Sequence, residues 1–285
     1  MKINSIELFV VSIPLKHPHK ASFGVFEQTN NIIIKIYTDK GIIGWGEANP
    51  LPPFTEETLE TVIAIIKDYI APFLLGKNPC NINLLQKEVD AIIYANNVAK
   101  AAIDIALYDI IGKTNNMPIH ELFGGNLYEK IPIAWALGCG DKKDDICLIE
   151  SHLNSGFQNF GLKVGQKSTR YDAERIINIY EHFGKKTTLY VDPNQGWTVL
   201  ETLRFIDYLQ DKTDNIVLEQ PIIRYDINGL KRIRNYSSIP IAVDESLFYV
   251  QDAANIIKQK AADLFSIKIS KNGGFTKARK IALMA

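Results

Sequence analysis

Hydrophobic positions first alternate with polar ones and then recur at helical spacing along the first third of the chain. Segments 3–13 and 31–37 are rich in Ile and Val, and turn-forming residues at 38–41 separate the second segment from 42–47. This pattern predicts three strands, the last two joined as a hairpin. Apolar residues in 59–70 and 99–111 follow the i, i+3, i+4, i+7 spacing of amphipathic helices. Strands followed by helices in this order predict an α+β domain over residues 1–128.

Two acidic residues of the second predicted helix lie off its apolar stripe. These residues are Asp104 and Asp109. We expect them to be solvated or to make polar contacts between elements, because a charged side chain is costly to bury without a partner.

From residue 129 onward, strand patterns alternate with helical ones. The predicted strands are 131–137, 159–164, 188–191, 215–218, 239–243 and 264–269. Strands that alternate with helices of 10–15 residues indicate βαβ units and a parallel sheet. The sequence contains no glycine-rich nucleotide-binding motif, which favours a barrel over a dinucleotide-binding sheet. We expect residues 129–285 to form this barrel domain, without a nucleotide cofactor.

Composition narrows the class of protein. The 285 residues carry 32 Lys+Arg against 32 Asp+Glu, and 46% are hydrophobic, which is typical of a packed domain and disfavours nucleic acid or an anionic membrane as a partner. The three cysteines, Cys80, Cys139 and Cys147, form no C-x-x-C pair and fit a reducing compartment. The N-terminus does not resemble a signal peptide, and no segment is apolar enough for a membrane span. We expect a cytoplasmic protein.

Charged residues stand at the carboxyl ends of five predicted barrel strands, which is where barrel enzymes keep their active sites. About one βα repeat separates each from the next, so they should meet at one rim. Each carboxylate alone could be a turn cap or a helix-start acid, but an unpaired buried lysine is costly. Because all five residues share the same position at a strand end, we expect them to form an active site. Its residues are Lys163, Asp192, Glu219, Asp244 and Lys268.

Three converging carboxylates would repel one another unless a cation lies between them. All-oxygen ligands select Mg²⁺, with Mn²⁺ possible, over zinc. Such a cation would bind a substrate carboxylate and stabilise the enediolate that forms when the neighbouring α-proton is removed. A lysine can remove that proton if burial or nearby positive charge lowers its pKa.

Several sequence motifs resemble those of the enolase superfamily, in its muconate lactonizing enzyme subgroup. GWGEANPLPPFTEET (44–58), AIDIALYDIIGK (102–113) and PIHELFGG (118–125) resemble the N-terminal capping domain of the subgroup. Its barrel motifs are matched by GLKVG (161–165), VDPNQGW (191–197), LEQP (218–221), AVDES (242–246) and IKISKNGG (267–274). The resemblance implies an α/β fold, a (β/α)7β TIM-type barrel with an α+β cap.

The resemblance also implies a role for each site residue. Asp192, Glu219 and Asp244 match the metal ligands. Lys163 and Lys268 match the acid/base lysines on opposite faces of the substrate. Asn194 would support the metal site by contacting the ligands, without binding the metal itself.

The sequence departs from the subgroup in two places. Gly161 stands where the subgroup usually has the first lysine of Lys-x-Lys. The sequence also stops in the helix after the sixth predicted barrel strand, so we expect it to be part of a longer protein.

The two lysines favour racemisation or epimerisation of an amino acid derivative or dipeptide, because one lysine can remove the α-proton and the other can return it. The alternatives are a muconate-type cycloisomerase or an o-succinylbenzoate synthase-like lyase, and a metal-binding homologue with impaired catalysis, for which Gly161 is the hint. We expect a small-molecule carboxylate substrate and a homo-oligomer.

Segment 15–29 is polar and turn-rich and lies between two predicted strands. A connection of this length is more often functional than a plain one. We expect a loop that lies over the barrel rim, with Phe23 or Phe26 facing the substrate. A hairpin tip without such a role is the alternative.

Overall fold

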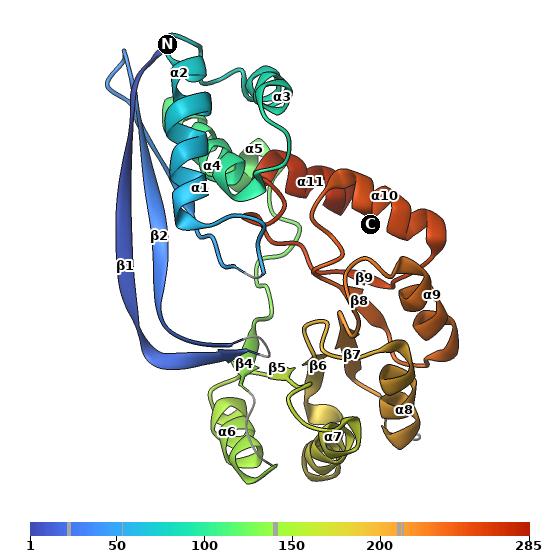
Figure 1. Cartoon of the computed structure of the whole chain (residues 1–285). Helices are drawn as coiled ribbons and strands as arrows, with labels where there is room; N and C mark the ends of the chain where they lie inside the picture. The colour runs from blue at the N-terminus through green and yellow to red at the C-terminus, as the bar shows by residue number, and fades with distance from the viewer. Residues whose placement is uncertain (22–23, 53, 139–141, 210–211, 213) are drawn as a thin grey trace.

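The computed structural model describes residues 1–21, 24–52, 54–138, 142–209, 212 and 214–285. Its polypeptide forms an N-terminal part with an antiparallel sheet and a second part with a parallel sheet, joined through the segment between α5 (Ile119–Leu122) and β4 (Ala134–Leu137) (Figure 1). The domain boundary expected between residues 128 and 129 falls in that segment and stays a prediction.

The N-terminal part packs helices against a sheet whose strand order is β1-β2-β3 within the described residues. The strands are β1 (Ile3–Ala21), β2 (Gly24–Thr38) and β3 (Ile43–Ala48). The helical segments are α1 (Leu59–Ala64), η1 (Ile65–Ile70, a π-helix), α2 (Ala71–Leu74), α3 (Ile82–Ile92), α4 (Asn97–Asn115) and α5. Alternating Ile side chains of β2 are buried in the core that includes α4. A Cβ on Gly46 would lie 1.9 Å from the Ala102 carbonyl oxygen, so β3 can approach α4 only with glycine there.

Segment 15–29 is mainly strand rather than the expected loop. β1 and β2 pair from Ile3↔Thr38 to Pro14↔Gln28 and again from His19↔Phe26 to Ala21↔Gly24, with a register shift between the two stretches. β1 is an edge strand, where a proline costs no ladder hydrogen bond if its nitrogen faces away from the partner. Pro18, the proline of this segment, therefore did not end the strand, and the hairpin reaches toward β4 (Figure 1).

The second part has a parallel sheet in the order β4-β5-β6-β7-β8-β9 within the described residues. Its other strands are β5 (Asn159–Lys163), β6 (Thr188–Asp192), β7 (Ile216–Glu219), β8 (Ile241–Val243) and β9 (Leu264–Phe265). Between and after them lie α6 (Lys142–Asn154), α7 (Thr169–Phe183), η2 (Gly184–Lys186, a 3-10 helix), α8 (Val199–Leu209), α9 (Ile227–Tyr236), α10 (Val250–Gln259) and α11 (Phe275–Met284). Buried aliphatic and aromatic side chains of the strands and helices form one core. The α/β prediction is confirmed.

α4 of the N-terminal part contacts α11 of the second part (Figure 1). Asp104 of α4 is fully buried and accepts hydrogen bonds from the Thr276 amide and hydroxyl, at 3.0 and 2.7 Å. Asp109 accepts from the Trp45 amide. Both off-stripe acids thus make contacts between elements, and Asp104 is not solvated. No helix among the described residues is long and apolar enough to cross a membrane.

Candidate active site

The five predicted site residues gather at the carboxyl edge of the parallel sheet. Lys163, Asp192 and Glu219 are the last residues of β5, β6 and β7. Asp244 follows β8 directly, and Lys268 lies three residues beyond β9. Lys163 and Asp192 are paired in register. The sheet order thus sets the two lysine-bearing ends on either side of the three carboxylate-bearing ends.

Lysines and carboxylates of this edge form ion pairs. Lys163 Nζ donates to Asp192, and Lys268 Nζ donates to Asp244. Lys271, which the sequence analysis did not select, also donates to Asp244 at 2.6 Å from a fully buried position. The ammonium of Lys268 lies 4.5 Å from the ring centre of Phe54, which belongs to the N-terminal part. The cap domain therefore contributes to one side of the site.

Crowding and burial shift the protonation of the carboxylates in different directions. Burial raises the pKa of Asp192 in spite of its partner Lys163. Burial, and then repulsion from Asp192 and Asp244, raises the pKa of Glu219. Burial opposes ionisation of Asp244 as well, but the ammoniums of Lys271 and Lys268 outweigh it and lower its pKa. The three carboxyls thus lie close enough to interact electrostatically.

Lys163 does not have the lowered pKa that the sequence analysis required of a base. Burial disfavours its charge, but Asp192 and then Glu219 outweigh burial, and the net effect raises its pKa. A cation beside these carboxylates would weaken this effect, because it would compete with the ammonium for the same negative charge.

The carboxylate oxygens at this edge are suitable ligands for a hard cation, although in this structure those of Asp192 and Asp244 form ion pairs with lysines. Among the residues that the structure describes, no three His, Cys, Asp or Glu side chains form a ready-made metal site. Lysine ammoniums occupy oxygens of Asp192 and Asp244 instead. The carboxylate oxygens of Asp192, Glu219 and Asp244 are nevertheless the ligand type that Mg²⁺ prefers.

Asn194 holds the side chain of Asp192, and Gln220 holds the backbone of Asp244. The Asn194 amide donates to Asp192 Oδ1 at 2.8 Å, and the Asn194 side chain donates to Glu245. Gln220 Oε1 accepts from the Asp244 amide at 3.0 Å. Asn194 thus contacts Asp192, a predicted metal ligand, through its backbone amide, and its role in supporting a metal site stays a prediction.

Three residues at this edge were not predicted from the sequence, namely Lys271, Gln220 and Glu245. The fully buried Gln220 has a positive φ of 34°, and burial with repulsion from Asp192 raises the pKa of Glu245 to about 7. Lys271 precedes Asn-Gly-Gly, a context typical of an exposed turn. The only feature of the sequence that could have indicated a role for Lys271 was its place in the strand-end motif 267–274.

Gly161, the departure from Lys-x-Lys, lies two residues before Lys163 in β5. A Cβ built there meets no atom within 4 Å in the described structure. Nothing in the backbone packing thus requires glycine at this position.

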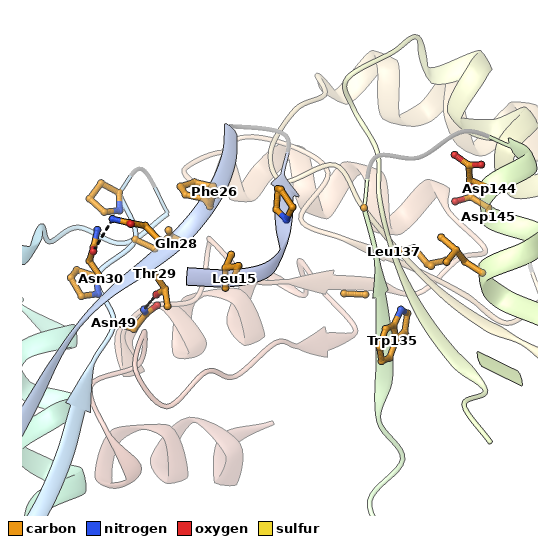
Figure 2. A pocket seen from close by; sticks show the side chains of 17 residues that line it. Leu15, Phe26, Gln28, Thr29, Asn30, Asn49, Trp135, Leu137, Asp144 and Asp145 are labelled. Atoms are coloured by element: carbon orange, nitrogen blue, oxygen red, sulfur yellow. Dashed lines mark hydrogen bonds between the residues drawn. The ribbon is translucent and has the colours of Figure 1, made fainter. Parts of the chain in front are cut away.

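A cavity of about 750 Å³ lies between the tip of the β1–β2 hairpin and the end of β4. Leu15 and Phe26 line it from the hairpin, and Trp135 and Leu137 from β4, as Figure 2 shows. Leu137 pairs with Leu162, the residue before Lys163, so the cavity adjoins the strand of one lysine. Phe23 lies outside the described residues.

A capping α+β domain over a parallel α/β sheet with charged strand ends defines an enolase-like protein. The family "Mandelate racemase / muconate lactonizing enzyme, N-terminal domain" matches residues 5–124, and "Enolase C-terminal domain-like" matches residues 148–285. The chain belongs to the mandelate racemase/muconate lactonizing enzyme family of the enolase superfamily.

Similar proteins of known activity are racemases, epimerases and cycloisomerases. The N-succinyl-L-Arg/Lys racemase of Bacillus cereus is 36% identical over 100% of this chain and 77% of its own length. The dipeptide epimerase of Cytophaga hutchinsonii, solved with Mg and the dipeptide D-Ala-L-Val, is 33% identical with a TM-score of 0.93 over 100% of this chain and 77% of its own. The 2-chloromuconate cycloisomerase of Rhodococcus opacus 1CP is 34% identical with a TM-score of 0.94, over 100% and 78%.

Proposed function

We propose that this protein is a Mg²⁺-dependent isomerase that racemises or epimerises an amino acid derivative or dipeptide at the carbon next to its carboxylate. The observation that carries the proposal is the placement of Lys163 and Lys268 on either side of the carboxylate-bearing strand ends. Two ammonium groups so placed can reach opposite faces of one α-carbon, which a 1,1-proton transfer requires.

In this mechanism the protein's own groups hold the substrate and move one proton. One lysine removes the α-proton from its face, and the other delivers a proton to the opposite face. Whichever lysine acts as base must be neutral first, so its ion pair with Asp192 or Asp244 must loosen. Ionisation of all three carboxylates becomes favourable only when positive charge neutralises them.

Asp192, Glu219 and Asp244 would hold the metal ion, with Asn194 supporting Asp192 through its backbone amide. When bound, Mg²⁺ would fix the substrate carboxylate and stabilise the negative charge that develops on it. Mn²⁺ can take the same all-oxygen ligands. The structure of the Cytophaga hutchinsonii relative in complex with Mg supports Mg²⁺ as the cation.

The cavity beside β4 is suited to the substrate's distal group. Apolar Leu15, Phe26 and Trp135 line it together with the amide side chains of Gln28 and Asn49. This lining fits a group with both an apolar part and an amide or acyl part. The hairpin tip would act as the lid, with Phe26 against the substrate.

Incubation in deuterated water tests the proposed function. The purified protein with Mg²⁺ is mixed with N-succinyl amino acids and dipeptides of each configuration, and NMR follows deuterium at the α-position and inversion. Both enantiomers of at least one substrate should exchange and interconvert. Conversion of muconate with no exchange in the panel would select the cycloisomerase, and neither activity in the presence of measurable Mg²⁺ binding would select the impaired homologue.

Three properties predicted from the sequence belong to the same proposal. They are a cytoplasmic location, a homo-oligomeric state, and the absence of nucleic acid and membrane partners. Fractionation of cells and size-exclusion chromatography with light scattering test the first two.

A further inference from the structure

The turn that carries Lys268 is held from the N-terminal domain, whereas the strand that carries Lys163 is held from within the barrel. Lys268 lies in the connection between β9 and α11, and its amide donates to Asn272 Oδ1 at 2.9 Å. Asn272 is fully buried, and its side-chain amide donates to the carbonyls of Leu247 and Phe248 at 2.8 and 3.1 Å. Asn272 thus ties Lys268 to the loop after β8.

Asn97, the first residue of α4, joins the same two loops from the cap domain. Its side-chain nitrogen donates to the Phe248 carbonyl at 3.2 Å and to the Lys271 carbonyl at 3.0 Å. Asn97 is 2% exposed, and a Cβ on Gly273 would come within 2.9 Å of its Oδ1. Asn97 therefore fits closely against the Lys268 turn.

The N-terminus of α4 is itself fixed. The carboxylate of Glu57 is buried and accepts hydrogen bonds from the amides of Val98 and Ala99, at 2.6 and 3.0 Å. Because Asn97 is anchored on one side by this cap and on the other by the turn, a shift of its side chain would be passed on to Lys268.

Lys163 has a different support. Its carbonyl accepts a hydrogen bond from Arg175 Nη1 of α7 at 2.8 Å, and the same guanidinium is paired with the buried carboxylate of Asp145. Arg175, Asp145 and Lys163 all belong to the barrel domain, so loss of Asn97 leaves this support intact.

We propose that Asn97 is a positioning residue for Lys268 and not for Lys163. Through its two hydrogen bonds, the cap domain sets the position of only one of the two proton-transfer lysines. The proposal rests on the function proposed above, since it assumes that both lysines exchange the α-proton. It assigns to the N-terminal domain a role in the stereochemistry of one half-reaction.

Face-resolved proton exchange tests this role. Lys163→Ala and Lys268→Ala first establish which enantiomer each lysine serves. Asn97→Ala should then lower exchange of the enantiomer served by Lys268 by about 10- to 100-fold and leave the other within about twofold, because small misplacements of a catalytic group are costly. An equal loss for both enantiomers, or an unchanged ratio, would overturn the proposal.

Thr276→Val is the matched control. It removes a hydrogen bond between the two domains, from the Thr276 hydroxyl to Asp104, without touching the Lys268 turn. In this control the ratio of the exchange rates of the two enantiomers should equal that of the wild type. A change in this ratio as large as that in Asn97→Ala, which we call the skew, would overturn the proposal. If Asn97→Ala does not fold, Asn97→Asp, which keeps the size but not the donor, should give the skew.

A measurement without substrate separates this proposal from the proposed function. Labelling by an amine-reactive reagent, quantified by mass spectrometry, reports the accessibility of Lys268 relative to Lys163. Asn97→Ala should raise that ratio by about twofold or more, because the turn opens locally, and Thr276→Val should not. If the wild type exchanges neither enantiomer, the proposed function fails, and the labelling ratio still decides whether Asn97 positions Lys268.

Discussion

Lys163 and Asp192 end neighbouring parallel strands in register, and the lysine ammonium donates to the carboxylate across the sheet edge. The same pairing of a lysine with a carboxylate recurs between Lys268 and Asp244. Each proposed base thus forms an ion pair with a proposed metal ligand. Because the lysine and a metal ion would compete for the same carboxylate oxygens, metal binding should release the lysine from its ion pair.

Glu219→Gln should remove most of the Mg²⁺ affinity while the protein stays folded. Glu219 lies between Asp192 and Asp244 and is repelled by both, so the neutral amide relieves repulsion in the metal-free protein and removes one anionic ligand. At a Mg²⁺ concentration of about 100 times its Kd, the wild type should gain about 2.7 kcal/mol of stability. Calorimetric titration and thermal unfolding with and without Mg²⁺ measure both effects.

Glu150, exposed on α6, provides the control for that substitution. Glu150→Gln should bind Mg²⁺ like the wild type. Wild-type affinity in Glu219→Gln would exclude Glu219 as a ligand.

Asp104→Asn should flatten the pH dependence of stability. Burial raises the pKa of Asp104 above its usual 3.8 in the folded protein, despite hydrogen bonds from Thr276 and Gln86. Between 3.8 and that raised value the folded state binds more protons than the unfolded state, so the free energy of unfolding falls as pH rises. One such proton is worth at most about 1.4 kcal/mol per pH unit.

Urea unfolding of wild type and Asp104→Asn at several pH values, from about 4 upward, measures the difference in slope. The test compares the slopes and not the absolute stabilities, because the variant also loses a hydrogen-bond acceptor and is expected to be less stable throughout. Parallel curves would show that Asp104 does not titrate abnormally.

Phe26→Ala should lower kcat/KM for the identified substrate by about tenfold or more, because a phenyl group buried against a ligand contributes about 1.5–3 kcal/mol. Phe26 lines the cavity beside β4, and the loss should come mainly through KM. Phe9→Ala is the control, since Phe9 is an exposed side chain of the same hairpin outside the cavity lining. Equal kcat/KM in both variants would remove the lid from the proposal.

The sequence predicted the parts of the site that repeat with the fold. Strand ends of a βα repeat recur at regular intervals, so the spacing of Lys163, Asp192 and Glu219 was enough to predict that they lie at one edge of the sheet. Segment 15–29 was expected to be a loop because it is polar and turn-rich and contains Pro18, whereas an edge strand tolerates a proline.

Other site residues could not be found in this way because they act through tertiary contacts. Asn97 binds two backbone carbonyls that lie more than 150 residues away in the sequence, and Lys271 is buried against Asp244 by the folding of a turn. Every residue has a backbone carbonyl, so the sequence does not show which carbonyls a side chain such as Asn97 will bind. The sequence likewise gave no sign that Asp104 is buried, where it accepts hydrogen bonds from Gln86 of α3 and Thr276 of α11.

The two lysines should show complementary losses if the reaction is a 1,1-proton transfer. A lysine can exchange a proton only with the face it reaches, and Lys163 and Lys268 extend from β5 and from beyond β9, on either side of the carboxylates. Lys163→Ala should abolish α-proton exchange from one enantiomer, while Lys268 still exchanges it from the other. Lys268→Ala should give the mirror result, and both should lose net racemisation.

NMR at the α-position in deuterated water, with each enantiomer and each variant, measures these losses. Lys258→Ala is the control, since Lys258 is exposed on α10 away from the sheet edge, and it should exchange both enantiomers like the wild type. A cycloisomerase uses a single lysine for proton chemistry, so loss of all exchange in one lysine variant and retention in the other would replace the racemase with the cycloisomerase. Stereospecific losses in both variants require two bases on opposite faces, which a single-base mechanism cannot produce.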